Sequence, residues 1–207
     1  MAEFFELIAG GRDPEVKFNI ERDEFYNQWW EQRGTPMLRN VFEKFGVGVL
    51  RRASILDGPN GLDGFLRKNN FSGKRCIEIG TAKGLTAIVL AQYFDEVVSI
   101  DIETDADKFL VADFCGFSNK IKFIDVTGNT AKKELISMLD FDAAYSDGNH
   151  AQDAEFDFNI LRKCGRIVFH EYWPLQPPVW TLVNNLRRSP GNVEAEGLFA
   201  LWTDKRG

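Results

Sequence analysis

The stretch KRCIEIGTAKG, residues 74–84, decides the fold of this chain. The apolar run before its first glycine is short, which is typical of a buried strand, and the glycines indicate a tight turn. The next segment, LTAIVLAQYF (85–94), predicts a helix, and EVVSID (96–101) predicts a second strand. A helix of about ten residues between two strands is typical of a crossover between parallel strands. This part of the chain therefore predicts a parallel sheet.

The same alternation continues towards the C-terminus. Further strands are predicted at 120–126, 141–147 and 166–172, and residues 191–204 are expected to form a final strand or a hairpin with a turn at Glu196–Gly197. Further helices are predicted at 106–117, 131–139, 150–163 and 179–188, the first with an apolar stripe at positions 106, 109, 110, 114 and 117. Helices are then expected on both faces of the sheet. In such sheets ligands bind at the carboxyl ends of the strands, so functional residues are expected just after each strand.

Composition narrows the class of function. The chain has 207 residues, a net charge of −6 and 44% hydrophobic residues, which is ordinary for a globular protein. Binding to nucleic acid depends largely on Lys and Arg, so an acidic chain without a basic run is a poor candidate for it. No apolar stretch is long enough to cross a membrane. The start of the chain has no signal-peptide pattern, and Cys76, Cys115 and Cys164 are expected to be reduced, buried thiols, which favours a cytoplasmic location.

Acidic residues follow the first two predicted strands. Glu78 directly precedes the glycine loop, whose G-x-x-x-G spacing lacks the G-x-G-x-x-G pattern of a dinucleotide site. A carboxylate there would repel a pyrophosphate but could bind an ammonium group. Asp101 lies about twenty residues further on, where nucleotide-binding sheets place a carboxylate for the ribose hydroxyls. The loop alone could be a simple turn, but both features together favour a nucleotide-type site.

EIGTAKG followed by Asp101 resembles the cofactor site of the class I S-adenosylmethionine-dependent methyltransferases, over roughly residues 72–204. The resemblance implies an α/β fold with a Rossmann-like, doubly wound, mostly parallel sheet of seven strands, and S-adenosylmethionine as cofactor. It implies that one group of residues lines the methionine and ribose side: Glu78, Gly80, Thr81 and Gly84. It also implies that Asp101 binds the ribose, that Ile102 packs against the adenine, and that the segment around Val126 (125–127) faces the adenine.

The segment YSDGNH (145–150) follows the predicted fourth strand. Together with the sequence through FHEYW (169–173), it is similar to small-molecule O-methyltransferases of the catechol and macrolide-sugar type, many of which use Mg²⁺. The resemblance implies that Asp147 contacts the cofactor beside the methyl group to be transferred. The chain departs from that subgroup at Asn149, Gly165 and Glu171, and the longer arm of Glu171 changes the geometry that a metal would meet.

Methyl transfer to oxygen requires the acceptor hydroxyl to lose its proton. His150 suits the role of general base, because imidazole titrates near neutral pH. Asp147 and Glu171 could bind Mg²⁺ or another divalent cation that lowers the pKa of the hydroxyl. His170 could be a further metal ligand or a second base. Simpler interpretations stay open, because Asp147 and His150 could form a helix-start turn and His170 could be a polar residue at a sheet end.

Aromatic residues could wall an acceptor site. One group flanks the loop PLQPP after the fifth strand: Tyr172, Trp173 and Trp180. Another lies in residues 1–70, which are predicted to form a helical extension to a domain at 71–207, with a short helix near 61–68: Tyr26, Trp29 and Trp30. The extension could act as a lid, pack its aromatic residues into a core, or make a homodimer contact.

The leading hypothesis is an S-adenosylmethionine-dependent methyltransferase that acts on a hydroxyl of a small molecule such as a sugar, a phenol or a natural product. An oxidoreductase that binds a nicotinamide dinucleotide is disfavoured by the missing glycine of the dinucleotide motif. Two further alternatives stay open: a non-catalytic protein that binds S-adenosylmethionine, and an enzyme of another sulfonium reaction such as aminopropyl transfer.

Overall fold

The computed structural model describes residues 61–102, 107–148, 153–189 and 191–205. The expectations for the lid or dimer role of Tyr26, Trp29 and Trp30 lie outside these residues. The same holds for Asn149 and for the predicted general base His150.

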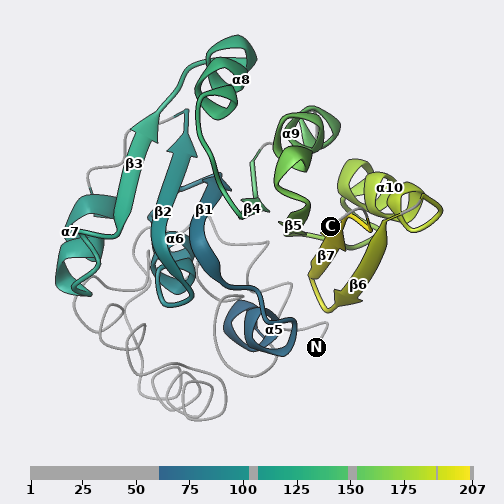
Figure 1. Cartoon of the computed structure of the whole chain (residues 1–207), viewed down its shortest axis with the longest axis horizontal. Helices are drawn as coiled ribbons and strands as arrows, with labels where there is room; N and C mark the ends of the chain where they lie inside the picture. The colour runs from purple at the N-terminus through teal and green to yellow at the C-terminus, as the bar shows by residue number, and fades with distance from the viewer. Residues whose placement is uncertain (1–60, 103–106, 149–152, 190, 206–207) are drawn as a thin grey trace, which may run out of the picture.

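The centre of the molecule is one sheet of seven strands in the order β3-β2-β1-β4-β5-β7-β6 (Figure 1). The strands are β1 (Gly73–Ile79), β2 (Phe94–Asp101), β3 (Ile121–Asp125), β4 (Ala143–Ser146), β5 (Arg166–Phe169), β6 (Asn192–Glu196) and β7 (Phe199–Thr203). The first five are parallel, whereas β7 runs antiparallel to both β5 and β6. The predicted mostly parallel sheet is confirmed, and the C-terminal segment forms the hairpin rather than a single strand.

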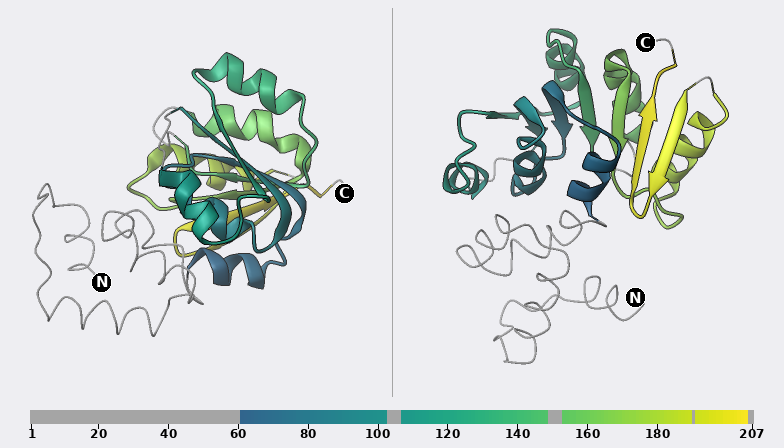
Figure 2. Two further views of the ribbon diagram at one scale, coloured as in Figure 1. Left: turned by 90° about the vertical axis from the view of Figure 1, so that its left-hand side faces the viewer. Right: turned by 60° about the horizontal axis from the view of Figure 1, so that its bottom comes forward.

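Helices cover both faces of the sheet (Figures 1 and 2). One face packs against α5 (Leu62–Lys68), α6 (Leu85–Leu90) and α7 (Asp107–Phe114). The other packs against α8 (Asn129–Ser137), α9 (Ala154–Leu161) and α10 (Pro177–Leu186). This is the doubly wound arrangement that the alternation of strands and helices predicts.

Alternation along the strands builds the two cores. In β1, Cys76 belongs to the core under α5–α7, whereas Ile77 and Ile79 belong to the core under α8–α10. Glu78 therefore faces the α5–α7 side, since successive side chains of a strand point to opposite faces. In register with Glu78 lie Ser99 of β2 and Tyr145 of β4. A row of three polar side chains thus crosses the centre of the sheet, and each of them is fully buried.

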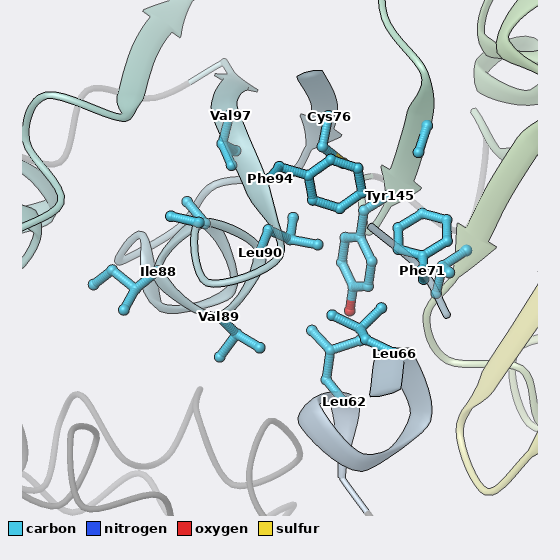
Figure 3. Packing of buried hydrophobic residues seen from close by; sticks show 14 of the residues in the cluster. Leu62, Leu66, Phe71, Cys76, Ile88, Val89, Leu90, Phe94, Val97 and Tyr145 are labelled. Atoms are coloured by element: carbon cyan, nitrogen blue, oxygen red, sulfur yellow. The ribbon is translucent and has the colours of Figure 1, made fainter. Parts of the chain in front are cut away.

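Helix α5 belongs to the core of the sheet. Its residues Leu62, Phe65 and Leu66 are buried in the same cluster as Tyr145. Figure 3 shows the ring of Tyr145 directed from β4 towards Leu66 and Leu62. The short helix predicted near 61–68 is confirmed, and it contributes to the core of the sheet. The domain boundary at residue 70 stays a prediction.

Helix α7 confirms the predicted element but not its predicted buried stripe. Phe109, Leu110 and Phe114 are exposed to 50%, 58% and 39%. The buried positions are instead Lys108, Val111 and Ala112. The physical reason is that the aliphatic stem of Lys108 lies in the apolar layer while its ammonium finds a carboxylate partner.

Two helices begin at other residues than the sequence predicts. Helix α9 starts at Ala154 rather than at residue 150. Helix α10 starts at Pro177, so the two prolines that end the PLQPP segment form its first turn instead of a loop. Proline is accommodated there because the first backbone N–H groups of a helix have no partner within the helix and the fixed φ of proline suits its start.

Candidate active site

The site lies where the chain changes direction across the sheet. From β1 the chain proceeds through β2 to β3 on one side, and β4 is added on the other side of β1. In sheets of this kind, ligands bind at this switch point, at the carboxyl ends of β1 and β4. The ends of β1, β2 and β4 carry Glu78, Asp101 and Asp147, so the structure brings the three predicted acids to one edge.

Glu78 is fully buried. One carboxyl oxygen, Oε2, accepts a hydrogen bond from the hydroxyl of Ser99. The Ser99 oxygen in turn lies 2.6 Å from the hydroxyl of Thr81, which acts as the donor because Ser99 donates to Glu78. The other oxygen, Oε1, has no hydrogen-bond partner among the described residues. Burial raises the pKa of Glu78 well above its ordinary value; the Ser99 hydrogen bond lowers this pKa, and the charges of Asp147 and Asp101 raise it further.

The glycine loop is pressed against the end of β4. Gly80 has φ +95°, and a Cβ on it would lie 2.1 Å from the carbonyl oxygen of Asp147. Gly84 has φ +77°, and a Cβ on it would lie 3.1 Å from Cβ of Lys108. Both positions therefore require glycine, for conformation and for space. The tight turn that the glycines predict is confirmed.

Asp101 connects the ends of β1 and β2. Its Oδ2 accepts from the backbone N–H of Ala82, and its Oδ1 accepts from the backbone N–H of Ile102, each at 2.7 Å. Each carboxylate oxygen has two acceptor positions, so each can accept one further hydrogen bond. The backbone N–H of Val126 donates to the carbonyl of Asp101 at 2.7 Å. The structure thus brings the predicted ribose residue next to Ile102 and Val126, the two residues predicted to face the adenine.

The structure also shows a residue that the sequence analysis missed. Lys108 of α7 is fully buried, and its Nζ lies 2.6 Å from Oδ1 of Asp125 at the end of β3. Its ammonium also lies 5.6 Å from the ring centres of Phe109 and Phe123. The sequence signal that could have identified this residue is a lysine within an apolar helical segment. A charged side chain that is buried at such a position is expected to have a partner of opposite charge. Lys108 also packs against the glycine loop at Gly84.

Asp147 and His170 form a pair across β4 and β5. Nδ1 of His170 lies 2.7 Å from Oδ1 of Asp147. Because a carboxylate can only accept, we assign the proton to Nδ1. The imidazole is stacked between Tyr145 at 6.3 Å and Phe199 at 5.3 Å, and only 7% of the residue is exposed. His170 is therefore held in a position from which it orients the carboxylate of Asp147.

The predicted metal ligands were Asp147, His170 and Glu171. Within the part of the chain that the structure describes, no three His, Cys, Asp or Glu side chains are grouped so that they could hold a metal ion. Glu171 follows β5 with a left-handed backbone, φ 55°, which is uncommon for a residue with a side chain. The described residues therefore do not form the predicted set of metal ligands. The metal stays a prediction.

An aromatic wall lies beyond the end of β5. The rings of Tyr172 and Trp180 are stacked at 4.7 Å, and the guanidinium of Arg187 lies 5.2 Å from the Tyr172 ring centre. The Tyr172 hydroxyl donates to Asn184 at 3.2 Å. Tyr172 is buried and Trp180 is half-buried, so Trp180 presents the accessible part of this wall.

The described residues fit the predicted cofactor. Oε1 of Glu78 is buried and has no partner among these residues, and Asp101 has spare acceptor positions. These two features match an ammonium group and the ribose hydroxyls, respectively.

No protein-family model and no curated protein matches the sequence. Solved structures do match the fold. A methyltransferase from Podospora anserina, bound to S-adenosylhomocysteine (SAH), has a TM-score of 0.62 and 16% identity, over 93% of this chain and 99% of that one. An O-methyltransferase of tomaymycin synthesis from Streptomyces achromogenes, bound to S-adenosylmethionine (SAM), has a TM-score of 0.54 and 19% identity, over 69% and 77%.

A third matched structure is named for a different reaction. A precorrin 8w decarboxylase from Methanobacterium thermoautotrophicum has a TM-score of 0.52 and 15% identity, over 71% of this chain and 91% of that one. Similarity at these identities concerns the fold, and one fold can carry several reactions. Among the described residues, no helix is long and apolar enough to cross a membrane. Taken together, the sheet order, the switch point and these matches show that the chain has the Rossmann-like fold of the class I methyltransferases.

Proposed function

We propose that this protein is a SAM-dependent methyltransferase that methylates a hydroxyl group of a small molecule. The observation that carries the proposal is the placement of two acids on either side of one glycine loop. Glu78 is buried at the end of β1, and Asp101 is fixed by two backbone N–H groups at the end of β2. This placement suits a ligand that has an ammonium group at one end and a ribose at the other.

Each part of the cofactor finds a matching group. Asp101 would accept from the ribose hydroxyls, while its bonds to Ala82 and Ile102 keep the carboxylate in place. Glu78 would accept from the ammonium group of the methionine part. A dinucleotide fits less well, because its pyrophosphate would meet the carboxylate of Asp101 at the end of β2 and would offer no ammonium to Glu78.

The cofactor would supply an electrophilic methyl group on a sulfonium. The chain must orient the acceptor and remove its proton. Asp147, oriented by His170, is the described acid at the end of β4, and its carboxylate can accept a hydrogen bond from the acceptor hydroxyl. His150, three residues further on, is proposed as the general base that takes this proton.

A small hydroxylated acceptor is supported by two considerations. YSDGNH and the segment to FHEYW resemble small-molecule O-methyltransferases, and matched structures from Streptomyces achromogenes and Bacillus cereus are named O-methyltransferases. The half-buried Trp180 offers a flat apolar surface on which a ring could stack.

Calorimetric titration with SAH tests the cofactor site. Asp101→Ala should weaken binding by about 10²-fold or more, because two hydrogen bonds to a charged group are lost. Asp140→Ala removes an exposed acid elsewhere on the chain and should leave the affinity unchanged.

Equal affinity of the Asp101→Ala variant and the native protein would refute the cofactor assignment, and tight binding of NADH would favour the oxidoreductase. Once binding is established, a library of hydroxylated acceptors is assayed for transfer of a labelled methyl group. His150→Ala should bind SAH normally and lower turnover by about 10²-fold or more. Full turnover of that variant would remove His150 from the mechanism.

A further inference from the structure

The carboxyl group of Glu78 is enclosed, and no described residue compensates it with a positive charge. No part of the residue is exposed, and its Oε1 has no hydrogen-bond partner among the described residues. The groups that contact its other oxygen are neutral: the hydroxyl of Ser99 and, behind it, that of Thr81. An ionised carboxylate in such a position would lose its hydration and gain only one hydroxyl hydrogen bond.

The titratable groups around Glu78 add negative charge or none. Asp101 at the end of β2 and Asp147 at the end of β4 both disfavour ionisation of Glu78. Tyr145, its neighbour on β4, and Cys76, two residues earlier on β1, are themselves fully buried, and burial is the main cause that raises the pKa of each. The hydroxyl of Tyr145 has no hydrogen-bond partner among the described residues and is directed towards α5 (Figure 3), so it does not bond to Glu78.

We propose that Glu78 carries a proton in the cofactor-free protein and releases it when the ammonium group of the cofactor binds beside it. This inference rests on the proposed function, and it adds that cofactor binding is coupled to the loss of one proton. Before binding, the neutral acid avoids an uncompensated charge in the core. After binding, the ammonium supplies the missing partner for Oε1, and the carboxylate becomes the stable form.

The coupling makes affinity depend on pH. Binding of the ammonium and release of the proton favour each other, so raising the pH towards the pKa of free Glu78 should strengthen SAH binding by up to about tenfold per pH unit. Above that pKa the proton is already lost and the affinity should level off. In a variant that lacks the carboxyl group of Glu78, this part of the pH dependence of SAH affinity should vanish.

Calorimetry in buffers of different ionisation enthalpy measures the number of protons released. The titrations are run with SAH at about pH 6, where the α-amino group of the ligand, with an ordinary pKa of about 7.7–8.0, is already protonated. Native protein should release up to about one proton. Glu78→Gln, which keeps an acceptor for Ser99, should release about one proton fewer. Glu134→Gln, an exposed change on α8, should behave like the native protein.

A ligand that lacks the ammonium group tests whether the ammonium causes the release of the proton from Glu78. Methylthioadenosine keeps the adenine and ribose but lacks the amino acid part, so its binding should release no proton from Glu78. SAH and SAM both have the ammonium and should release the same number. Infrared difference spectra of native protein should show loss of a protonated-carboxyl C=O band with SAH and no loss with methylthioadenosine, which decides the matter even if Glu78→Gln does not fold.

The outcomes separate the two proposals. If SAH does not bind the native protein, the proposed function fails. If SAH binds, but native protein and Glu78→Gln release the same number of protons, or if the protonated-carboxyl band is unchanged, only the proton coupling fails. Proton release with methylthioadenosine equal to that with SAH would also overturn it, since the ammonium would then not be the cause.

Discussion

Asp157 and Glu78 are the least exposed acids among the described residues, and their surroundings differ in charge. Asp157 of α9 is 1% exposed, and its Oδ1 lies 2.6 Å from Nζ of Lys132 on α8. Glu78 of β1 is 0% exposed and accepts a hydrogen bond from the hydroxyl of Ser99. The first acid connects two helices. The second lies at the switch point of the sheet, and its Oε1 has no hydrogen-bond partner among the described residues, which fits the ammonium group of the proposed cofactor.

The largest expected effect comes from removing the cation of the structural pair. Lys132→Met should lower the free energy of unfolding by about 3–5 kcal/mol, because the buried Asp157 carboxylate would lose the ammonium group that lies 2.6 Å from it. Unfolding by urea measures the change. Lys133→Met, at the next and exposed position, should change the free energy by less than about 0.5 kcal/mol. Equal effects of both variants would contradict the view that Asp157 depends on Lys132.

The reactivity of two cysteine thiols tests how far burial alone shifts a pKa at positions where no ligand is expected. Burial raises the pKa of Cys115 and of Cys164 to about 11. At about pH 8 both should therefore react with iodoacetamide about 10²-fold more slowly than in urea, where thiols have a pKa of about 8.5. The rates should rise about tenfold per pH unit until near that value. Rapid alkylation of the folded protein at pH 8 would show that the thiols are more accessible than this.

The difference in stability between the native protein and Glu78→Gln should depend on pH. Because the folded-state pKa of Glu78 is raised by burial, the folded protein retains this proton at pH values where the unfolded chain has lost it. Native stability should therefore fall as the pH rises from the unfolded pKa, about 4.3, through the folded one, and then stay lower. Glu78→Gln should lack this loss and become the more stable protein at higher pH. Parallel stability curves for the two proteins would contradict the raised pKa.

The smallest expected effect concerns the neighbour of Glu78. The buried hydroxyl of Tyr145 has no partner in the part of the chain that the structure describes, so Tyr145→Phe should leave stability unchanged or raise it by up to about 1 kcal/mol. The matched variant Tyr172→Phe loses a hydrogen bond to Asn184 and should cost about 1 kcal/mol. Thermal unfolding of both variants measures the difference. A destabilised Tyr145→Phe protein would indicate that its hydroxyl has a partner after all.

The sequence predicted those features that depend on local pattern. Alternating strand and helix signals located the elements of the sheet, and the glycine loop with Asp101 predicted a nucleotide-type site at the carboxyl ends of the strands. The exposed face of α7 could not be predicted in this way. Phe109 and Leu110 belong to an apolar stripe in sequence, but Lys108 occupies the buried face because Asp125, on another element, supplies its counter-charge.

The roles of the site residues also divide into those that the sequence predicts and those that only the structure shows. Glu78, Asp101 and Asp147 were chosen from their positions after strands, and the structure brings them to one edge. His170 was considered as a metal ligand or a base; in the structure it bonds to Asp147 and stacks on two rings, which come from β4 and β7. No sequence pattern relates those strands to each other. His150 stays a prediction as general base.

The sequence by itself determined the parallel sheet, its glycine loop and the acids that follow β1, β2 and β4, because periodicity and turn chemistry act between near neighbours in the chain. Only the tertiary structure decided which of the charged groups are compensated. Lys132 meets Asp157 and Lys108 meets Asp125 across different elements, whereas Glu78 is enclosed with hydroxyl groups. The reason is that the state of a buried charge depends on what surrounds it in three dimensions.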